Sequence, residues 1–456
     1  MKLFFSKITQ AEPGLYDKQI RTADGGRSRV QLRIDADGSG VFWINAHENF
    51  YFNATAALIC KAMLDGKNDA ECEKLLRKKF PGEANRAAAD FKTFGPALRN
   101  LIEGKSRICD FCQSGSISSV TPFSIQPSAP YRMDIALTYA CSNNCAHCYN
   151  QKGRKPGTLS LKDWEKVLEK VKAAGIPHVV FTGGEPTLVP ELFDLIRHAE
   201  KLGLVSGLNT NGRRLKEPGF AQKLSDCGLD HIQITLESDD PSIHDRMVRS
   251  AGAWQETSAG IKEAVKIQNL HVMTNSTLLR DNASEAKVRS LIQFLSGLGL
   301  KTFALNALIY SGNGADVGTG LDESELPALI RAAQSEAAAQ RMNFIWYTPT
   351  QYCRFDPQQY DLGIKSCTAA RYSMCIEPDG AVLPCQSWYE QSVGNMLTNS
   401  WDQIWNHELC RSIRNLSFVP ESCRGCDVLN LCKSGCPLAS RYKPLTDFKP
   451  LLPESF

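Results

Sequence analysis

The sequence lacks the apolar segments that would place a protein in or beyond a membrane. None of its 456 residues belongs to a run of about 18 or more apolar side chains, the length that a spanning helix needs. The first residues, MKLFFSKITQ, contain no apolar run long enough for a signal peptide. We therefore expect a cytoplasmic protein with no membrane partner.

A large excess of charge of one sign is also missing. Lys and Arg number 52 and Asp and Glu number 49, so the charge balance does not favour nucleic acid as a partner. The content of 43% hydrophobic and 22% charged residues is ordinary for a globular protein. A chain of this length can bury a core without disulfides, and it predicts about two to four domains.

Cysteine, by contrast, is abundant, with 17 residues. In a chain without an export signal these thiols indicate metal ligands rather than disulfides. Cys60, Cys72 and Cys227 have no partner at a ligand spacing and are predicted to be small buried residues. The others form groups, with Cys353 and Cys410 outside them: Cys109 and Cys112; Cys141, Cys145 and Cys148; Cys367, Cys375 and Cys385; and Cys423, Cys426, Cys432 and Cys436.

These groups divide the chain into parts. Residues 26–105 contain β-rich runs around a DADGSG turn and then helical stretches, which predicts a small α+β domain. Residues 106–130 are rich in Ser and Pro and predict a linker. Residues 131–345 hold six β-rich runs that alternate with amphipathic helices, typical of a parallel α/β sheet, doubly wound or curved into a barrel. Residues 346–445 are loop-rich and Cys-rich, and their fold is expected to depend on metal.

The segment CSNNCAHCYN follows the first predicted strand of the α/β part. Cys141, Cys145 and Cys148 supply three thiolates, whereas a closed structural zinc site uses four ligands, so one position stays open for chemistry. The segment also lies at the carboxyl end of a parallel strand, where barrel enzymes place their active sites. The alternative is a zinc knuckle that takes its fourth ligand elsewhere, for example from His147.

A second motif, FTGGEP, follows the next strand. Its two glycines would let the backbone approach a ligand closely, and Glu185 adds a charge. Together with the cysteine segment one βα unit earlier, this motif resembles the radical S-adenosylmethionine (SAM) superfamily. The resemblance covers about residues 131–310.

The resemblance implies a partial (β/α)6 barrel with a SAM-binding [4Fe–4S] cluster on Cys141, Cys145 and Cys148. The remaining iron would bind the amine and carboxylate of SAM, whose reductive cleavage would give a 5′-deoxyadenosyl radical that abstracts a substrate hydrogen. The protein would position the reactants and exclude water. The implied SAM contacts are Gly183, Gly184, Glu185, Pro186, Asn209, Thr235 and Arg249.

A second resemblance rests on CRGCDVLNLCKSGC, from Cys423 to Cys436, and on IEPDGAVLPC upstream of it. Both are similar to the SPASM extension of radical SAM enzymes, which carries two auxiliary [4Fe–4S] clusters, although four such thiolates also suit zinc. The resemblance assigns Cys367, Cys375, Cys385 and Cys436 to the first cluster and Cys423, Cys426 and Cys432 to the second.

The family pattern has a further downstream cysteine that this chain lacks, since the 20 residues after Cys436 contain none. Cys410, Cys353, an oxygen or nitrogen ligand, or nothing would complete the second auxiliary cluster. Cys410 fits the inner face of a predicted helix and is expected to be buried instead. An electron relay is the expected role of such clusters, and substrate binding at an open iron is the alternative.

The N-terminal α+β domain looks like the winged-helix-like peptide-binding domain typified by the pyrroloquinoline-quinone precursor chaperone; an unrelated accessory domain is the alternative. Such domains occur fused to maturases of ribosomally made peptides. The candidate edge strands for a peptide are 30–34, 41–45 and 49–52, beside a helix at 54–63. For Cys109 and Cys112 the sequence leaves three roles open: a chance pair, a zinc half-site or a spare cluster ligand.

The sequence therefore predicts a radical SAM enzyme that cross-links, epimerises or oxidises a ribosomally synthesised precursor peptide, with a flavodoxin- or ferredoxin-type electron donor. The alternatives are a maturase of a folded protein, of the sulfatase-maturase type, an enzyme acting on a tetrapyrrole or another small molecule, and a non-catalytic zinc-binding interaction protein. No catalytic acid or base is predicted. The histidines are scattered and are expected to be structural or surface residues: His147, His178, His231 and His244.

Overall fold

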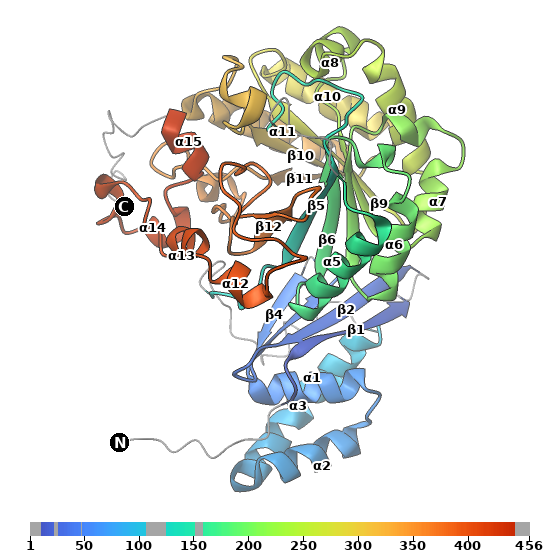
Figure 1. Ribbon diagram of the computed structural model, residues 1–456, viewed down its shortest axis with the longest axis vertical. Coiled ribbons are helices and arrows are strands. Elements are labelled where there is room, and N and C mark those ends of the chain that lie inside the picture. Colours follow the sequence, from blue (N-terminus) through green and yellow to red (C-terminus); the bar gives the residue numbers. More distant parts are fainter. Residues whose placement is uncertain (1–10, 22–25, 47, 106–124, 151–157, 443–456) are drawn as a thin grey trace. The chain divides into compact units, whose positions relative to one another are not determined.

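The computed structural model describes residues 11–21, 26–46, 48–105, 125–150 and 158–442 (Figure 1). Cys109, Cys112 and most of the predicted linker lie outside the described residues. The chain divides into two compact units. The first holds residues 1–121 with two short segments, 169–178 and 201–205, and the second holds the rest.

The N-terminal unit begins with an antiparallel sheet in the order β1-β2-β3-β4, and three helices follow it. The elements are β1 (Gly14–Arg21), β2 (Arg27–Ile34), β3 (Gly40–Ile44), β4 (Glu48–Phe52), α1 (Ala54–Leu64), α2 (Asp69–Lys79) and α3 (Ala84–Ile102). Local sequence sets the helix starts: Asn53 caps α1 through the Ala56 amide, and Asn68 forms a capping box with Glu71 at α2. The predicted small α+β domain is confirmed.

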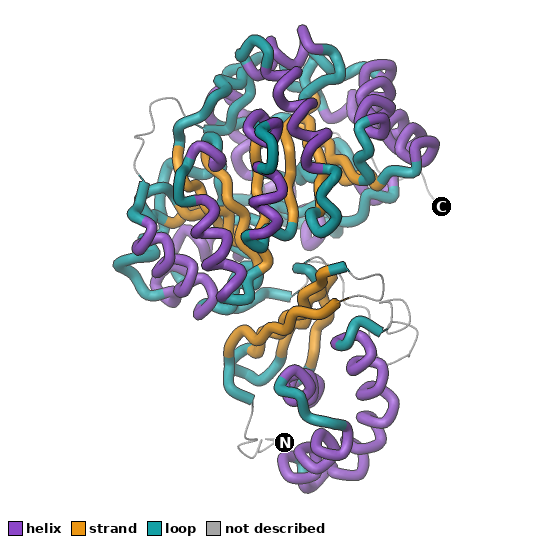
Figure 2. The backbone as a smooth tube through the Cα atoms, turned by 90° about the vertical axis from the view of Figure 1, so that its right-hand side faces the viewer, coloured by secondary structure: helices purple, strands orange, loops and turns teal. Residues whose placement is uncertain are grey.

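The helices of this unit all lie on one side of its four strands (Figure 2). The core between them is aromatic: the rings of Phe42 and Phe52 stack at 5.6 Å, and Phe94 of α3 meets Phe52 edge-on at 5.7 Å. Leu32 and Leu76 are fully buried in the same cluster. Burial of this apolar surface holds β4 and α3 on one core.

Of the three strands among which we expected the edge, the structure leaves one, β4, at the edge of the sheet. An unpredicted strand, β1, pairs with the whole of β2, and β3 lies between β2 and β4. Only β4 among the candidates is therefore an edge. The sequence pattern does not reveal β1 because its polar and charged residues interrupt any apolar alternation, and only Leu15 and Ile20 are buried in it.

Polar side chains of β2 are also buried, because they bond to the short segments of the same unit. The Gln31 amide donates to the carbonyls of Pro177 (2.8 Å) and Gly203 (3.0 Å). Asp17 and Lys172 form an ion pair at 2.8 Å. The buried amide nitrogen of Gln31 thereby avoids the cost of an unpaired donor, since both of its hydrogens are bonded.

The second unit is built on a nine-stranded sheet in the order β11-β10-β9-β8-β7-β6-β5-β12-β13. The six predicted strands of the α/β part are present in it: β5 (Arg132–Thr138), β6 (His178–Gly183), β7 (Val205–Thr210), β8 (His231–Thr235), β9 (His271–Leu278) and β10 (Thr302–Ala307). The helices that alternate with them are α5 (Leu161–Ala173), α6 (Leu192–Lys201), α7 (Phe220–Asp226), α8 (Pro241–Val248), α9 (Ala253–Ala264) and α10 (Glu285–Gly297), followed by α11 (Leu326–Gln340). The predicted α/β fold with a parallel core is confirmed.

The Cys-rich part continues this sheet instead of standing apart from it. Strand β12 (Ser373–Ile376) pairs in parallel with β5, and β13 (Val382–Leu383) pairs with β12. At the other end, β11 (Asn343–Trp346) pairs with β10, so the described strands form an open sheet, as a partial barrel requires. The remaining helices are short: α12 (Trp401–Trp405), α13 (Glu408–Arg414), α14 (Leu429–Cys432) and α15 (Pro437–Tyr442). In the described part of the chain, no helix is both long and apolar enough to cross a membrane.

The pairing of β7 with β8 depends on a glycine at one position. A Cβ atom on Gly207 of β7 would lie 2.1 Å from the ring of His231 on β8. Burial lowers the pKa of His231 to about 4, and the charges of His271 and Arg132 add to the effect. The ring is therefore neutral in the folded protein, as expected for a structural histidine.

This depressed pKa predicts a loss of stability in acid. The unfolded chain takes up a proton below the ordinary histidine pKa of about 6.5 while the folded chain does not, so stability falls as the pH drops from about 6.5 toward 4. We expect the free energy of unfolding to be lower at about pH 5 than at pH 7, by an amount of order 1–2 kcal/mol from this residue. Denaturant unfolding at pH 7 and pH 5 should show a smaller pH effect in His231→Gln than in the unaltered protein. His198→Gln, on helix α6, is the control, and an equal pH effect in both variants would contradict the assignment.

Candidate functional site

The cysteine loop, residues 141–148, follows β5 and is fixed by its backbone. The amides of Asn144 and Ala146 donate to the carbonyls of Val248 (3.0 Å) and Met247 (2.8 Å) at the end of α8. The Asn313 side chain donates to the Cys145 carbonyl at 3.2 Å. These bonds shape the loop without using its thiols, which leaves the thiols available as ligands.

The three thiols of the loop act on one another electrostatically. Burial raises the pKa of Cys141 to about 11, and the charges of Glu185 and Cys148 raise it further. Burial also raises the pKa of Cys145 well above its usual value, with the charges of Cys148, Glu237 and Cys141 in the same direction. Only a cationic centre would favour three thiolates here, because metal binding and deprotonation are coupled.

The donor set fits an iron–sulfur cluster. All three side chains are soft thiol ligands, the type that such clusters use. A closed zinc site would need a fourth ligand from outside the three cysteines of the loop.

His147, the alternative zinc ligand, is held by a buried carboxylate instead. Its Nε2 lies 2.8 Å from Oε1 of Glu237, and the other oxygen of Glu237 accepts the Thr277 amide at 2.7 Å. Burial lowers the pKa of His147, but the charge and hydrogen bond of Glu237, with the charge of Asp281, together outweigh it, and the net shift is upward. The Glu237 amide donates to Nδ1 of the buried His244 at 3.1 Å. The ion pair thus supports the loop from beneath, a structural role that the sequence predicted for both histidines.

The GGEP turn after β6 contacts the protein through its glycines. A Cβ atom on Gly183, whose φ is +131°, would lie 2.2 Å from the Thr138 carbonyl oxygen, and one on Gly184 would lie 2.3 Å from that of Ala140. The amides of Gly184 and Glu185 donate to these same carbonyls at 2.7 and 2.8 Å. The two glycines therefore allow the end of β5 and the residues after it to lie close to the turn, and their approach to a ligand stays a prediction.

Glu185 is buried and its two carboxylate oxygens are occupied by the protein. Oε1 accepts from the Thr187 amide (3.1 Å), the Thr187 hydroxyl (2.6 Å) and the Thr210 hydroxyl (2.7 Å). Oε2 accepts the Asn211 amide at 2.8 Å. Burial raises the pKa of Glu185, and these hydrogen bonds offset the shift only in part. Its carboxylate joins the ends of β6 and β7, so a SAM contact by Gly183, Gly184, Glu185 and Pro186 would fall to the backbone of the turn.

The three remaining predicted SAM contacts lie near the cysteine loop in the fold. Asn209 and Thr235 are half-buried near the carboxyl ends of β7 and β8. Arg249 is exposed and ends α8 in the left-handed conformation, directly after the carbonyls that hold the loop. Their contacts with SAM stay predictions.

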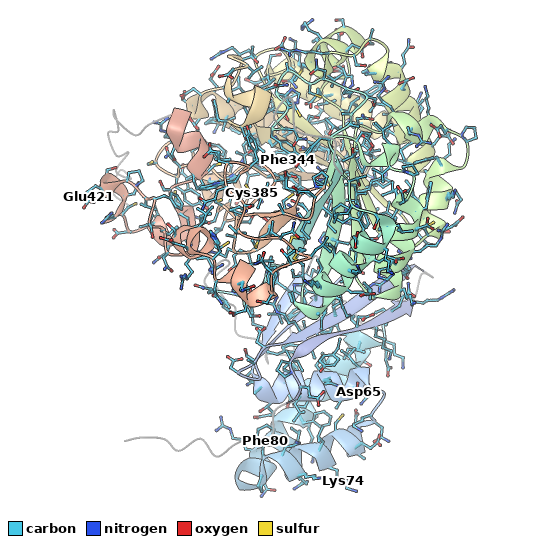
Figure 3. All side chains as sticks on the ribbon, in the orientation of Figure 1. Asp65, Lys74, Phe80, Phe344, Cys385 and Glu421 are labelled. Carbon is cyan, nitrogen blue, oxygen red and sulfur yellow. The ribbon has the colours of Figure 1, made fainter. Side chains whose placement is uncertain are left out.

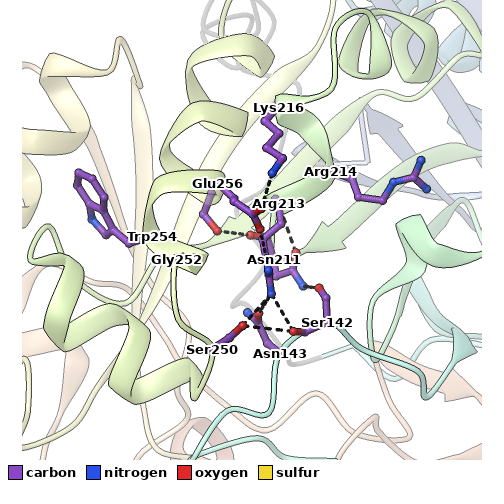
Figure 4. A network of polar contacts seen from close by, with 12 residues as sticks. Ser142, Asn143, Asn211, Arg213, Arg214, Lys216, Ser250, Gly252, Trp254 and Glu256 are labelled. Carbon is purple, nitrogen blue, oxygen red and sulfur yellow. Dashed lines mark hydrogen bonds and ion pairs between the residues drawn. The ribbon is translucent and has the colours of Figure 1, made fainter.

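Sequence reasoning missed Arg213, which clamps the cysteine loop (Figure 4). Its Nη1 donates to the Ser142 carbonyl (2.8 Å), the Asn143 side chain (2.9 Å) and the Ser250 hydroxyl (2.9 Å). Its Nε pairs with Glu256 of α9 at 2.5 Å. The motif LNTNG directly precedes it, but nothing in that motif indicates a partner 71 positions away.

Asn211, the second asparagine of LNTNG, was also missed. Its side chain donates to the Ser142 hydroxyl at 2.9 Å. Helix α9 packs closely behind it, since Thr257 donates to the Asn211 carbonyl and a Cβ atom on Gly260 would lie 2.2 Å from the Gly212 oxygen. Asn211 and Arg213 together hold the start of the cysteine loop against the end of β7.

The Cys-rich part gathers thiols into two sets. Burial and the charges of Cys436 and Cys385 raise the pKa of Cys367, and burial with the Cys436 charge raises that of Cys385, labelled in Figure 3, to about 12. Cys375 lies on β12, where its thiol packs with Ala136 and Leu383; its role as the fourth ligand stays a prediction.

The second set is built around Cys432, where burial and then the charge of Cys423 raise the pKa of the thiol. Cys426 is exposed in the turn that follows Cys423. Cys410 is fully buried on α13, as its helical spacing predicted, and the charged group that acts on it is Arg414. The place of Cys423, Cys426 and Cys432 as cluster ligands stays a prediction.

Comparison with known proteins shows which families and relatives the chain is similar to. Residues 135–295 match the radical SAM superfamily, and residues 367–427 match the SPASM family, described as an iron–sulfur cluster-binding domain. A PqqA peptide cyclase of Gluconobacter oxydans is 27% identical over 319 residues, 68% of this chain and 86% of the relative. One from Xanthomonas campestris pv. campestris is 28% identical over 320 residues, 67% and 82% of the two chains.

Two solved structures share the fold. Streptococcus suis SuiB bound to its precursor peptide SuiA superposes with a TM-score of 0.67 and 17% identity, over 93% of this chain and 97% of that one. The structure of anSMEcpe with bound AdoMet and Cp18Cys peptide gives a TM-score of 0.54 and 18% identity, over 70% and 92%. The larger coverage by SuiB extends the likeness to the N-terminal unit.

The clamp on the cysteine loop yields a prediction. Arg213→Ala removes three hydrogen bonds from a charged donor, each of order 1.5–3 kcal/mol, so the loop should hold its metal less firmly. We expect the variant to release about four irons to a chelator faster than the unaltered protein, with a lower rate of SAM cleavage. Iron release followed by absorbance measures this effect.

The control for this variant is Arg246→Ala, because Arg246 lies on nearby α8, is largely exposed and pairs only with Asp281 among its described partners. Equal iron release from the two variants would contradict the clamp.

Proposed function

We propose that this chain, a radical SAM enzyme with a SPASM iron–sulfur domain, modifies a ribosomally synthesised precursor peptide. The observation that carries the proposal is the four-stranded N-terminal unit, which offers β4 as a sheet edge in a chain that also holds radical SAM and SPASM domains. The names of the PqqA peptide cyclases and the precursor peptide in the SuiB structure support a peptide substrate.

The described residues fit the cofactors of such an enzyme. The [4Fe–4S] cluster to which SAM binds would be held by Cys141, Cys145 and Cys148. Cluster and SAM together would supply a 5′-deoxyadenosyl radical for hydrogen abstraction once one electron is delivered. The protein would keep the loop in place at two points. Arg213 binds the Ser142 carbonyl, and Glu237 holds the His147 side chain. A pre-organised loop avoids the cost of ordering it when the cofactors bind.

The N-terminal unit would bind the leader of the precursor peptide by strand addition. Phe50 and Phe52 anchor β4 to the aromatic core, while Asn49 is exposed and Tyr51 is half-buried. Main-chain hydrogen bonds along this edge give affinity with little demand on sequence. Helix α1 follows β4 directly and would form the wall of the groove. A bound leader would raise the effective concentration of the segment to be modified.

The two thiol sets of the SPASM domain would hold auxiliary clusters that relay electrons, because buried thiolate-bound clusters suit electron transfer. We further propose a flavodoxin- or ferredoxin-type electron donor, and a cytoplasmic setting without nucleic-acid or membrane partners. A maturase of folded proteins remains the second candidate. The anSMEcpe structure is itself named for a bound peptide, and the likeness to it covers 70% of the chain against 93% for SuiB, so both structures favour a peptide substrate.

The cofactor assignment predicts the iron content. The reconstituted protein should hold about twelve irons, and replacing Cys141, Cys145 and Cys148 together by Ala should remove about four of them and abolish SAM cleavage. The sheet should stay folded, because its buried residues Ile135 and Leu208 lie below the loop. Iron analysis, circular dichroism and chromatography of 5′-deoxyadenosine measure these outcomes. Cys227→Ala is the control. Formation of 5′-deoxyadenosine by the triple variant would contradict the assignment of these three cysteines as cluster ligands.

The peptide assignment predicts the effect of removing the N-terminal unit. A chain that begins at Ser114 should still bind SAM and cleave it slowly, but kcat/KM for the precursor peptide should fall by about 100-fold or more, because the second binding contact is lost. Adding the free N-terminal domain should restore part of this activity only if it docks. Undiminished modification of full-length precursor by the truncated chain would favour a folded protein or a small molecule as the substrate.

A further inference from the structure

The loop that follows β11 brings a cysteine to the second thiol set. This loop, residues 350–353, packs on the turn that runs from Cys432 to Gly435: a Cβ atom on Gly435 would lie 3.1 Å from the Gln351 amide nitrogen and from the Thr350 carbonyl carbon. The Tyr352 amide donates to the Cys432 sulfur at 3.3 Å. The next residue is Cys353, so this cysteine is delivered to the set by a close backbone contact.

The Cys432 sulfur is surrounded by backbone groups of this loop and of its own turn. It accepts hydrogen bonds from the amides of Tyr352, Ser434 and Gly435, and it lies 3.8 Å from the Thr350 carbonyl oxygen. Hydrogen bonds to cluster sulfurs are also one of the means by which proteins set the potential of iron–sulfur centres.

The turn that provides two of these amides is strained. Lys433, Ser434 and Gly435 have successive φ values of +52°, +63° and +72°. The left-handed conformation is unfavourable for each residue that is not glycine, so two such residues in a row need a compensating interaction. Binding of the thiolate to a metal centre would provide it, since strain of this kind is typical of functional sites.

Cys353 follows directly after the residue whose amide binds the Cys432 sulfur, and it is half-buried there. The Cys423 sulfur lies 3.9 Å from the Ser434 hydroxyl, which places it at the same turn. Cys410 differs, because it is fully buried on α13 and Arg414 is the charged group that acts on it.

We propose that Cys353 is the fourth ligand of the second auxiliary cluster, beside Cys423, Cys426 and Cys432. The inference rests on the iron–sulfur assignment of the proposed function. It replaces the absent downstream cysteine of the family pattern by one from upstream of the whole SPASM match, which begins at residue 367. Four thiolates leave no iron open, so this cluster serves electron transfer and does not bind the substrate.

Iron analysis of the full-length reconstituted protein tests the proposal. Cys353→Ala should hold about one to four fewer irons than the unaltered protein, or show the resonance signal of a three-iron cluster, because one iron loses its protein ligand. Cys410→Ala, the matched control, should keep the full iron content and an unchanged spectrum. Equal iron content and spectra for the two variants would overturn the proposal.

A double variant separates the two auxiliary clusters. If Cys353 and Cys423 serve one cluster, Cys353→Ala with Cys423→Ala should lose no more than about four irons. A loss of about eight would place Cys353 on the first auxiliary cluster and overturn the proposal. Zinc instead of iron in the unaltered protein would overturn the cofactor assignment as well, and it is recognised by metal analysis before any variant is made.

Alkylation of the unaltered protein avoids any folding defect of the variants. With its clusters in place, the protein should protect Cys353 from iodoacetamide, and extraction of the iron should expose Cys353 together with Cys423 and Cys426. Cys410 should react equally before and after extraction, because packing alone protects it. Mass spectrometry of the digested protein reads each cysteine separately, and alkylation of Cys353 that does not depend on the iron would contradict its role as a ligand.

Discussion

The close approach of the ends of β5 and β6 is the contact on which the functional site depends. Two carbonyls at the end of β5, those of Thr138 and Ala140, accept the amides of Gly184 and Glu185, and a side chain on Gly183 or Gly184 would occupy the same space. Because the cysteine loop begins at residue 141, this backbone contact fixes where the loop starts. It also points the Glu185 carboxylate at the end of β7, where it accepts from Thr210 and the Asn211 amide. Three neighbouring strands are thus joined at their carboxyl ends.

Two buried carboxylates flank the cysteine loop, and both act on its thiols. The charge of Glu185 raises the pKa of Cys141, and that of Glu237 raises the pKa of Cys145. Each carboxylate is itself satisfied by backbone amides, so it stays in place whether or not a metal is bound. An anionic surrounding opposes empty thiolates and favours thiolates that carry a cationic cluster. The electrostatics of the site therefore favour its metal-bound state.

The sequence predicted the six core strands because each is a dense β-rich run between helical patterns. It did not predict β1, in which polar and charged residues interrupt the apolar pattern. It also did not predict β12 and β13, which have four and two residues inside a Cys-rich loop. The two motifs located the site because spacing within one loop is visible in the sequence. Arg213 and Glu237 were not visible, since their partners lie 71 and 90 positions away. The glycines of the turn were recognised as special, but a sequence does not reveal which backbone comes near.

The pairing of β12 with β5 has a consequence for how the protein is made. Met133 of β5 lies opposite Met374 of β12, so a strand from the first third of the chain has a neighbour that the ribosome produces some 240 residues later. Until then β5 has an unpaired edge, and an unpaired strand edge is a template for association with other chains. Long-range pairing of this kind is also slow to form. The sheet beneath the cysteine loop is therefore completed only once the SPASM segment has been synthesised, and insertion of iron before that point would meet an unfinished core.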